Sequence, residues 1–590
     1  MSVNNFKAIF TLIVFLIAEV LVSFPVYIPV PSYLRKRFKT WKLVPSMTRI
    51  PINYVTAPTG AVLILLAAGC IHGEQIRSGI VGSDGVEPLN VMTLFICLAY
   101  MILSVDKAGV LRFLAFWVAS RSGSSGIKLY VAIYAFFFGV GAIIGNDPVI
   151  LSGVPFLAYF THETGIHPPT AWIFSQFVNA NIASAVLVSS NPTNLVLSGA
   201  FAISYFVYTA KIILPVLAAT LLTLPALLFL FRDPKYIPRE MKPISLSPRS
   251  ALIDPFGGVF GSTILVLTLC TLVATSTLHP QLYQVTVPPA IIVLSRDILY
   301  DLRSYPARKE ELKVASEGQD NDNMALQKME KVPNAQVQMV TNEDQNGDIT
   351  LVGISPSKQG EHDTSSGPVV NRGSATSFRP NEQTTSSKGE AGTAPEAEAT
   401  KLASPELQKT NSNPLERMFP TVTAILRIMP FSLVLFSFSL FILVQGLGVT
   451  GWVDVWAGWW ATWVEKTGLV GTVFGMGLVS CILCNIFGTN IGATILLARV
   501  LQVWIQTSSP TPSQRLQDGA IYTLALGSNY GAFTFSFPAS LAGLLWRKLL
   551  LAKGIKVKMG QFARLNLLPC AVAMGVSCTV LIGEIYVIHK

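Results

Sequence analysis

The sequence predicts an all-α polytopic membrane protein with two inverted-topology repeats, broken helices or re-entrant hairpins, and about 11 to 13 membrane segments. Of its 590 residues, 51% are hydrophobic and only 13% are charged, whereas a soluble domain carries about 25% charged residues. Apolar runs close to the ~20 residues needed to span a bilayer occur in both parts of the chain. Polar motifs interrupt these runs twice in the same order, which is typical of two matching units.

Composition divides the chain into four regions. One stretch is rich in Ser, Thr, Asn, Gln, Glu and Pro, a composition typical of disordered segments. The apolar runs before it and after it supply the membrane helices. We therefore expect a first repeat in residues 1–250, the first two helices of a second repeat in 251–302, a disordered cytoplasmic loop in 303–418 and the remainder of the second repeat in 419–590.

Basic clusters set the expected orientation. The formal net charge is +10, but the Lys and Arg side chains gather in short clusters between apolar runs, such as Leu34–Lys39 and Arg547–Lys558. Such clusters mark the cytoplasmic side of a membrane protein rather than a nucleic-acid site, so both termini are expected on the opposite side. The run Phe10–Val30 precedes its basic cluster, which favours a retained helix over a cleaved signal.

Polar residues collect at two places in each half. The first half contains GNDP (Gly145–Pro148) and SSNPTN (Ser189–Asn194), with NAN (Asn179–Asn181) just before the latter. The second half contains CNIFGTNIGAT (Cys484–Thr494) and GSNYGAFTFSFPAS (Gly527–Ser540). In each half roughly 45 residues separate the two motifs, enough for two short half-helices or one hairpin at a rise of ~1.5 Å per residue.

These motifs are expected to break helices at membrane depth. Proline cannot continue the interior hydrogen-bond ladder of a helix, and glycine loosens it. Such breaks are tolerated inside a membrane only where the freed groups line a cavity or meet protein. Freed N–H groups at the start of a half-helix favour an anion, and freed carbonyls favour a cation. The expected helix-break residues are Pro148, Pro192, Gly488, Gly492, Gly531 and Pro538.

The polar side chains at the breaks are the candidate ligands of a solute or ion. A charged side chain at the bilayer centre costs about 2.5–3.5 kcal/mol, so an intramembrane carboxylate is a functional candidate. Asp147 is therefore the expected site of proton or cation coupling, with a purely structural Asp as the alternative. For Asn179 and Asn181, packing between helices is an equal alternative. The full set is Asn146, Asp147, Asn179, Asn181, Ser189, Ser190, Asn191, Thr193, Asn194, Asn485, Thr489, Asn490, Thr494, Ser528, Asn529, Thr534 and Ser536.

Four other polar residues interrupt apolar runs. Asp106 marks either a turn near the membrane interface or the end of a half-helix. Glu19 and Lys211 lie near the ends of runs and are expected to reach the interface. Arg499 is expected to point to the interface, with pairing to Asp147 as the alternative.

The sequence carries no signature of an enzyme. It contains no Walker A motif, nucleophile elbow, HExxH or dinucleotide fingerprint, which argues against an ATP-driven pump and against most membrane enzymes. No cofactor is expected. Its seven cysteines lie in or beside apolar segments, so a disulfide framework is not expected. Thr161–His167 holds two histidines and a glutamate, which suit a solvated turn better than a metal site.

On these motifs the sequence resembles the arsenite/antimonite permease family of the ion-transporter superfamily, which also includes sodium/proton antiporters and citrate and dicarboxylate carriers. The resemblance lies in Asn146-Asp147, in Ser190, Asn191 and Asn194, and in the closing segment Leu526–Trp546. It implies a secondary active transporter of a small inorganic ion or oxyanion, with arsenite/antimonite-type efflux coupled to protons or sodium.

The second half departs from the arsenite branch of that family. Asn529 stands where those members usually carry an acidic residue, and Gly488-Thr489-Asn490 replaces their Asn-Asn-x-Pro run, so the second site is less charged. A sodium/proton antiporter and a citrate/dicarboxylate-type anion carrier remain alternatives, and a gated ion channel is the alternative of another class. The expected partners are a small inorganic ion or organic anion and the lipid bilayer of a plasma or vacuolar membrane, with no nucleic acid; a homodimer is left open.

Overall fold

The computed structural model describes residues 3–29, 49–82, 87–121, 123, 125–240, 248–275, 281–330 and 414–589. The chain divides into two units, one of residues 1–305 with 400–590 and one of residues 306–399, of which only 306–330 are described. Helix α13 (Leu282–Glu330) begins in the first unit and ends in the second. It therefore enters the segment 303–418, whose remainder before Pro414 lies outside the described residues, as does the basic cluster Leu34–Lys39.

The N-terminal part of the first unit combines helices with one short hairpin. Strands β1 (Val26–Pro29) and β2 (Arg49–Ile52) pair antiparallel, with Val26 opposite Ile52, and add a small sheet that the sequence did not predict. The helices of this part are α1 (Phe6–Ser23), α3 (Thr56–Ala67), α4 (Gly73–Ile80) and α5 (Pro88–Lys107).

The rest of the first half follows the predicted breaks. Helix α7 ends where Gly145 adopts a φ of 90°, and α8 starts at the next residue. A positive φ is readily available only to glycine, so the sequence fixes this break. The elements are α6 (Val110–Arg121), α7 (Gly126–Ile144), α8 (Asn146–Glu163), α9 (Thr170–Ala183), η1 (Val188–Ser190), α10 (Pro192–Ala200) and α11 (Tyr205–Leu230).

The second half has one long, kinked helix. Gly468 has a φ of 61° inside α18, which therefore consists of two helices joined at this glycine. The elements are η2 (Pro248–Ala251), α12 (Pro255–Thr275), α13, α15 (Pro414–Met418), α16 (Pro420–Ile428), α17 (Phe431–Val449), α18 (Trp452–Ile486), α19 (Asn490–Thr507), α20 (Gln514–Gly531), η3 (Phe537–Ala539), α21 (Leu541–Ala552) and α22 (Met559–Ile588).

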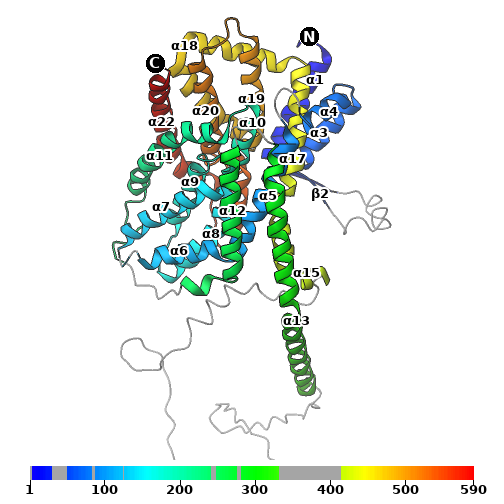
Figure 1. Cartoon of the computed structure of the whole chain (residues 1–590), viewed down its shortest axis with the longest axis vertical. Coiled ribbons are helices and arrows are strands. Elements are labelled where there is room, and N and C mark those ends of the chain that lie inside the picture. The colour runs from blue at the N-terminus through cyan, green and yellow to red at the C-terminus, as the bar shows by residue number, and fades with distance from the viewer. Residues whose placement is uncertain are drawn as a thin grey trace, which may run out of the picture. The chain divides into compact units, whose positions relative to one another are not determined.

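The same order of elements occurs in both halves. A long helix ends at a glycine break, two helices follow, and then come a 3₁₀ turn, a short helix and a long helix: α7 to α11 in the first half, and the end of α18 to α22 in the second. The halves exchange contacts reciprocally, because α8 packs against α21 and α10 packs against α19. Helices α11 and α22 lie side by side (Figure 1).

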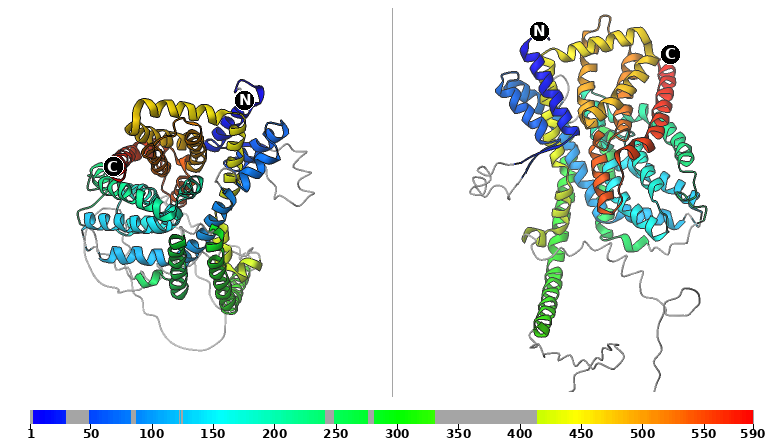
Figure 2. Two further views of the ribbon diagram at one scale, coloured as in Figure 1. Left: turned by 45° about the horizontal axis from the view of Figure 1, so that its top comes forward. Right: turned by 180° about the vertical axis from the view of Figure 1, so that it is seen from behind.

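Among the described residues, eight helices are long and apolar enough to cross a membrane. Their outer faces expose large apolar side chains, such as Leu221 at 69% and Phe206 at 66%, which would be unfavourable in water and suit lipid. The N- and C-termini lie at the same end of the first unit (Figure 2). The prediction of an all-α polytopic membrane protein is confirmed.

Candidate functional site

The break at Gly145 brings the two first-half motifs into contact. A Cβ atom at position 145 would lie 2.3 Å from the backbone oxygen of Ser190, so only glycine lets the 3₁₀ turn η1 approach this closely. The Ser190 hydroxyl donates to the backbone oxygen of Ala142 at 2.5 Å. As a result, Asn146 and Asp147, in the first turn of α8, lie beside the serines of SSNPTN.

A cavity of about 380 Å³ opens at this contact. That volume lies within the roughly 300–1,000 Å³ of typical small-molecule sites. Asp147 lines the cavity and is partly exposed to it, and Lys548 on α21 and Arg427 on α16 contribute positive charges. Apolar side chains of α5 and α21 complete the walls. The polar lining residues from the sequence motifs are Asn146, Asp147, Ser189 and Ser190.

Asn529 joins the two halves through a buried hydrogen-bond network. Its side-chain oxygen accepts from the Asn191 amide at 2.8 Å and from the Ser184 hydroxyl at 3.0 Å. Its own amide donates to the side-chain oxygen of Asn194 at 2.8 Å. The Asn194 amide in turn donates to the backbone oxygens of Ser184 and Leu187, at 2.8 and 2.9 Å. Because these groups are buried, each hydrogen bond is costly to remove, and the network fixes SSNPTN against α20.

The second break is built around Gly488, which has a φ of 59°. The Thr489 hydroxyl then caps α19 by accepting from the backbone N–H of Ile491 at 3.1 Å. Asn485, just before the break, donates to the Thr534 hydroxyl and accepts from the Ser536 hydroxyl at 3.0 Å. These bonds tie CNIFGTNIGAT to the segment after α20, as Ser190 ties the first-half motifs together.

Several predicted site residues hold helices together instead of lining the cavity. Asn179 donates to the backbone oxygen of Tyr134 at 2.5 Å, and Asn181 accepts from the Asn146 amide at 3.0 Å. The remaining side chains form hydrogen bonds with residues two to four positions away in the sequence: Thr193 with Asn191, Thr494 with the backbone of Asn490, and Ser528 with the backbone of Ala525.

The predicted helix-break residues fall at different positions relative to the breaks. Gly488 lies between two helices, and Pro192 is the first residue of α10. Pro148 and Pro538 lie in the first turn of α8 and in η3, respectively. Gly492, in contrast, is the third residue of α19, and Gly531 is the last residue of α20.

The other polar residues that interrupt apolar runs have defined contacts, and Glu19 departs from expectation. Glu19 is 1% exposed, so the expectation that it reaches the interface is wrong. Lys211 forms an ion pair with Asp518 on α20. Arg499 donates to Gln502 at 3.3 Å. Asp106 is the second-last residue of α5, in agreement with the expected end of a half-helix, and its carboxylate accepts from the Ser152 hydroxyl of α8.

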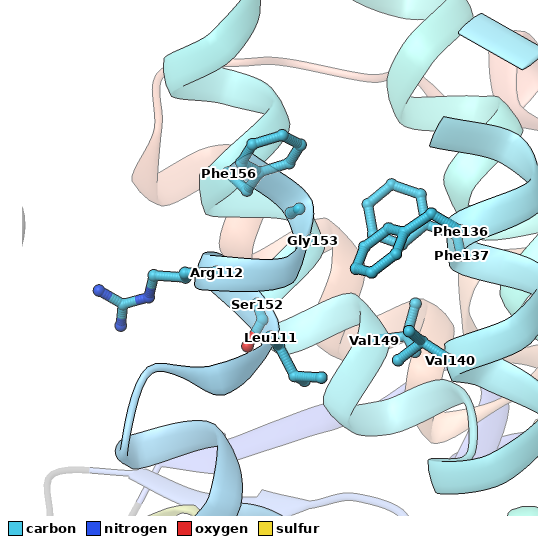
Figure 3. Close-up of a pocket in the computed structure, with 10 residues that line it drawn as sticks. Leu111, Arg112, Phe136, Phe137, Val140, Val149, Ser152, Gly153 and Phe156 are labelled. Carbon is cyan, nitrogen blue, oxygen red and sulfur yellow. The ribbon is translucent and has the colours of Figure 1, made fainter. Parts of the chain in front are cut away.

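Two further recesses are unsuited to a polar solute. Figure 3 shows a recess between α6, α7 and α8, where Phe136 and Phe137 face Gly153 and the Arg112 guanidinium points away. It holds about 10 Å³, room for at most one water. An apolar recess of about 600 Å³ lies between α1, α18 and α19, and its tryptophans, including Trp459 and Trp463, suit lipid chains. No group of three metal-ligating side chains occurs in the part of the chain that the structure describes.

Sequence reasoning did not single out Ser184, Lys548 or Arg427 as site residues. Ser184 lies five residues before SSNPTN, close enough to have been included with that motif. Arg427 and Lys548 are 121 residues apart in the sequence and meet only at the cavity, so no local pattern marks them as a pair.

Comparison with known proteins relates both parts of the chain to membrane transporters. A family model described as "Citrate transporter" matches residues 45–304, and one described as "Arsenical pump membrane protein" matches residues 419–584. An arsenical pump membrane protein of Escherichia coli (strain K12) is 29% identical over 220 residues, which are 36% of this chain and 49% of that protein. A putative arsenical pump membrane protein of Bacillus subtilis (strain 168) is 24% identical over 189 residues, 31% and 41% of the two chains.

The chain spans about half, or less than half, of the length of the two curated relatives that it matches. A solved structure of the YdaH transporter of Alcanivorax borkumensis aligns over 98% of both chains, with a TM-score of 0.45 and 11% identity. The apolar helices and the family matches define an integral membrane protein of the transporter class. Within that class, the matches support an arsenical pump and citrate transporter-like family.

Proposed function

We propose that this protein is a secondary active transporter that moves a small inorganic ion or oxyanion, with arsenite/antimonite-type efflux as the first candidate, coupled to protons or sodium. The observation that carries the proposal is the cavity at the start of α8, where Asp147 faces a space of about 380 Å³ among serine and asparagine side chains. A carboxylate at a helix break supplies a site for the coupling ion, and neutral hydroxyl and amide groups supply ligands for a small polar solute.

The packing of the two halves supports alternating access. We infer that the halves are inverted-topology repeats, because the same elements recur and α8 packs on α21 as α10 packs on α19. In such transporters one unit rocks against the other around a fixed central site. The Asn529 network joins the first half to the second half and would hold the site together during that motion. The plasma membrane is the location we propose.

An organic-anion carrier of the citrate/dicarboxylate type is the second candidate. Lys548 and Arg427 line the same cavity as Asp147, and two cations at a cavity wall attract an anionic solute. Arg427 is already paired with Glu416, so Lys548 is the stronger contributor. The first-half match to a citrate transporter model agrees with this candidate.

A counterflow assay on the purified protein in liposomes tests the proposal. Vesicles loaded with unlabelled solute take up labelled solute transiently if a carrier exchanges the two, whereas a gated channel gives no such trans-stimulation. Arsenite, antimonite, silicic acid, citrate and sodium form the panel. Counterflow of arsenite or antimonite supports the first candidate, and counterflow of citrate alone replaces it with the second. Labelled flux without counterflow would overturn the transporter proposal in favour of a channel.

A further inference from the structure

One carboxyl group lies deep in the first unit without a partner. Glu19 of α1 is 1% exposed, and neither of its side-chain oxygens has a hydrogen-bond partner among the described residues. A carboxyl buried in this way is stable only when it is neutralised by a proton or another cation. The proposed function uses Asp147 and leaves Glu19 without a role.

Helix α1 lies directly against the second helix break. A Cβ atom at Gly492, in the first turn of α19, would lie 3.9 Å from Oε2 of Glu19. One turn further along α1, the Ser23 hydroxyl donates to the backbone oxygen of Ile486 at 2.9 Å. One turn earlier, the Phe15 ring packs edge-on against Phe487. One face of α1 thus follows the break, with Glu19 in the middle of it.

The two breaks carry their acidic groups differently. After Gly145 the chain reads Asn-Asp, and after Gly488 it reads Thr-Asn, so Asn490 corresponds to Asp147 when residues are counted from the glycine, although it is the first residue of α19 and Asp147 is the second residue of α8. The first-half break has its carboxyl on the broken helix itself. The second-half break lacks one there, and Glu19 brings a carboxyl to it from another helix.

We propose that Glu19 is a proton-binding site of the second half and that it replaces, from α1, the carboxyl missing from the start of α19. A hard metal cation takes several oxygen ligands, and no group of three His, Cys, Asp or Glu side chains gathers around Glu19 in the described part of the chain. A proton needs only the carboxylate, which becomes a neutral acid. A role for that proton in driving transport rests on the proposed function.

The surroundings of Glu19 contain few other titratable groups. Among the described residues, the helices α3 and α17 and the turn η3, which pack against α1, carry no titratable side chain. On α1 itself, Lys7 lies three turns away and donates to the backbone of Gly69 at 2.9 Å. Helix α19 carries Arg499, two turns beyond Gly492. On α18 the titratable side chains are Asp454, Glu465, Lys466, Cys481 and Cys484.

Infrared difference spectroscopy of the full-length protein in lipid nanodiscs tests the site without a known solute. Spectra are compared between pH 6 and pH 9, where exposed carboxyl groups with an ordinary pKa near 4.3 stay ionised. We expect Glu19→Gln to remove one component of the protonated carboxylic acid band. That component should remain in Glu465→Gln, which changes an exposed carboxylate of α18. The Asp147→Asn variant shows how much of the band comes from the carboxyl group at the first break.

The same variants are then compared for solute uptake driven by a pH gradient. We expect Glu19→Gln to lower this uptake by about tenfold or more, while counterflow at equal pH continues. If Glu19→Gln misfolds, Glu19→Asp keeps the carboxyl and should shift the infrared band. An unchanged band in both variants would overturn the proton site, and unchanged pH-driven uptake would overturn its role in coupling. If no solute of the panel is transported, the proposed function fails, and the infrared result still decides whether Glu19 binds a proton.

Discussion

The breaks at Gly145 and Gly488 share a glycine with a positive φ but differ in the side chains that follow it. Both glycines have a positive φ, of 90° and 59°, and both precede an 18-residue helix. The first break presents Asp147 to a cavity of about 380 Å³. The second presents Asn490, which is 4% exposed, and is covered by α1.

The comparison distinguishes the glycine, which the backbone conformation of each break requires, from the side chain that follows it. Each glycine is needed because another segment approaches it closely: the Ser190 backbone at Gly145 and the Ser23 backbone at Gly488. The residue two positions after each glycine differs, Asp147 in one half and Asn490 in the other, so the backbone break does not determine its charge. The open, acidic break fits the proposed solute and coupling-ion site, and the closed, neutral break fits the proposed proton site on α1.

Substitution of either glycine by alanine should have the largest effect. At Gly145 a Cβ atom would meet the Ser190 oxygen at 2.3 Å, and at Gly488 it would meet the Ser23 backbone nitrogen at 2.8 Å. Unfavourable φ and overpacking together should lower the free energy of unfolding by about 3 kcal/mol or more. Gly554→Ala is the matched control, because Gly554 has a φ of 75° but open space around it, and should cost only about 1–2 kcal/mol. Unfolding in detergent measures the difference, and equal losses would show that close approach is unimportant.

Asp147→Asn should abolish coupling and leave the fold intact. Asparagine has nearly the same shape, and Asp147 faces the cavity rather than a packed interior. We expect ion-coupled uptake in proteoliposomes to fall by about a hundredfold, within the range of typical coupling energies. The apparent melting temperature should stay close to that of the unmodified protein. Coupled uptake at the original rate and with the original pH dependence would remove Asp147 from the mechanism.

The sequence motifs lie at these breaks, whereas the surroundings of the breaks depend on contacts between distant segments. Gly145 and Pro192 act through their own backbone, so GNDP and SSNPTN mark breaks without knowledge of the fold. Glu19, in contrast, was expected near the membrane interface, since its neighbours in the sequence have the pattern of an ordinary apolar helix. Its burial depends on contacts between α1 and residues near Gly488, such as the bond from Ser23 to Ile486, which joins positions 463 residues apart. No local pattern contains that information.

Asn529→Ala should weaken the hydrogen-bond network between the two halves, with a smaller effect on stability than the glycine substitutions. The change removes bonds to Ser184, Asn191 and Asn194 and leaves buried polar groups without a partner. Stability should fall by about 2 kcal/mol. Ser528→Ala is the control, because among the described contacts the Ser528 hydroxyl bonds only to the backbone oxygen of Ala525 in its own helix. This change should cost less than about 1 kcal/mol. Similar melting temperatures for the two variants would mean that the network contributes little.

Lys548→Gln should have the smallest effect and distinguish the candidate solutes. Lys548 is exposed and lines the same cavity as Asp147, so its charge acts mainly by attracting an anion, and salt screens it. For an anionic solute such as citrate, we expect the KM to rise by about two- to fivefold at low ionic strength and by less at high salt. For a neutral solute such as undissociated arsenite, the KM should not change. Lys556→Gln, an exposed lysine outside the cavity lining, serves as the control. An equal rise of the KM in both variants would assign the effect to the overall surface charge, and Lys548 would then have no specific part in the acidic break of the first half.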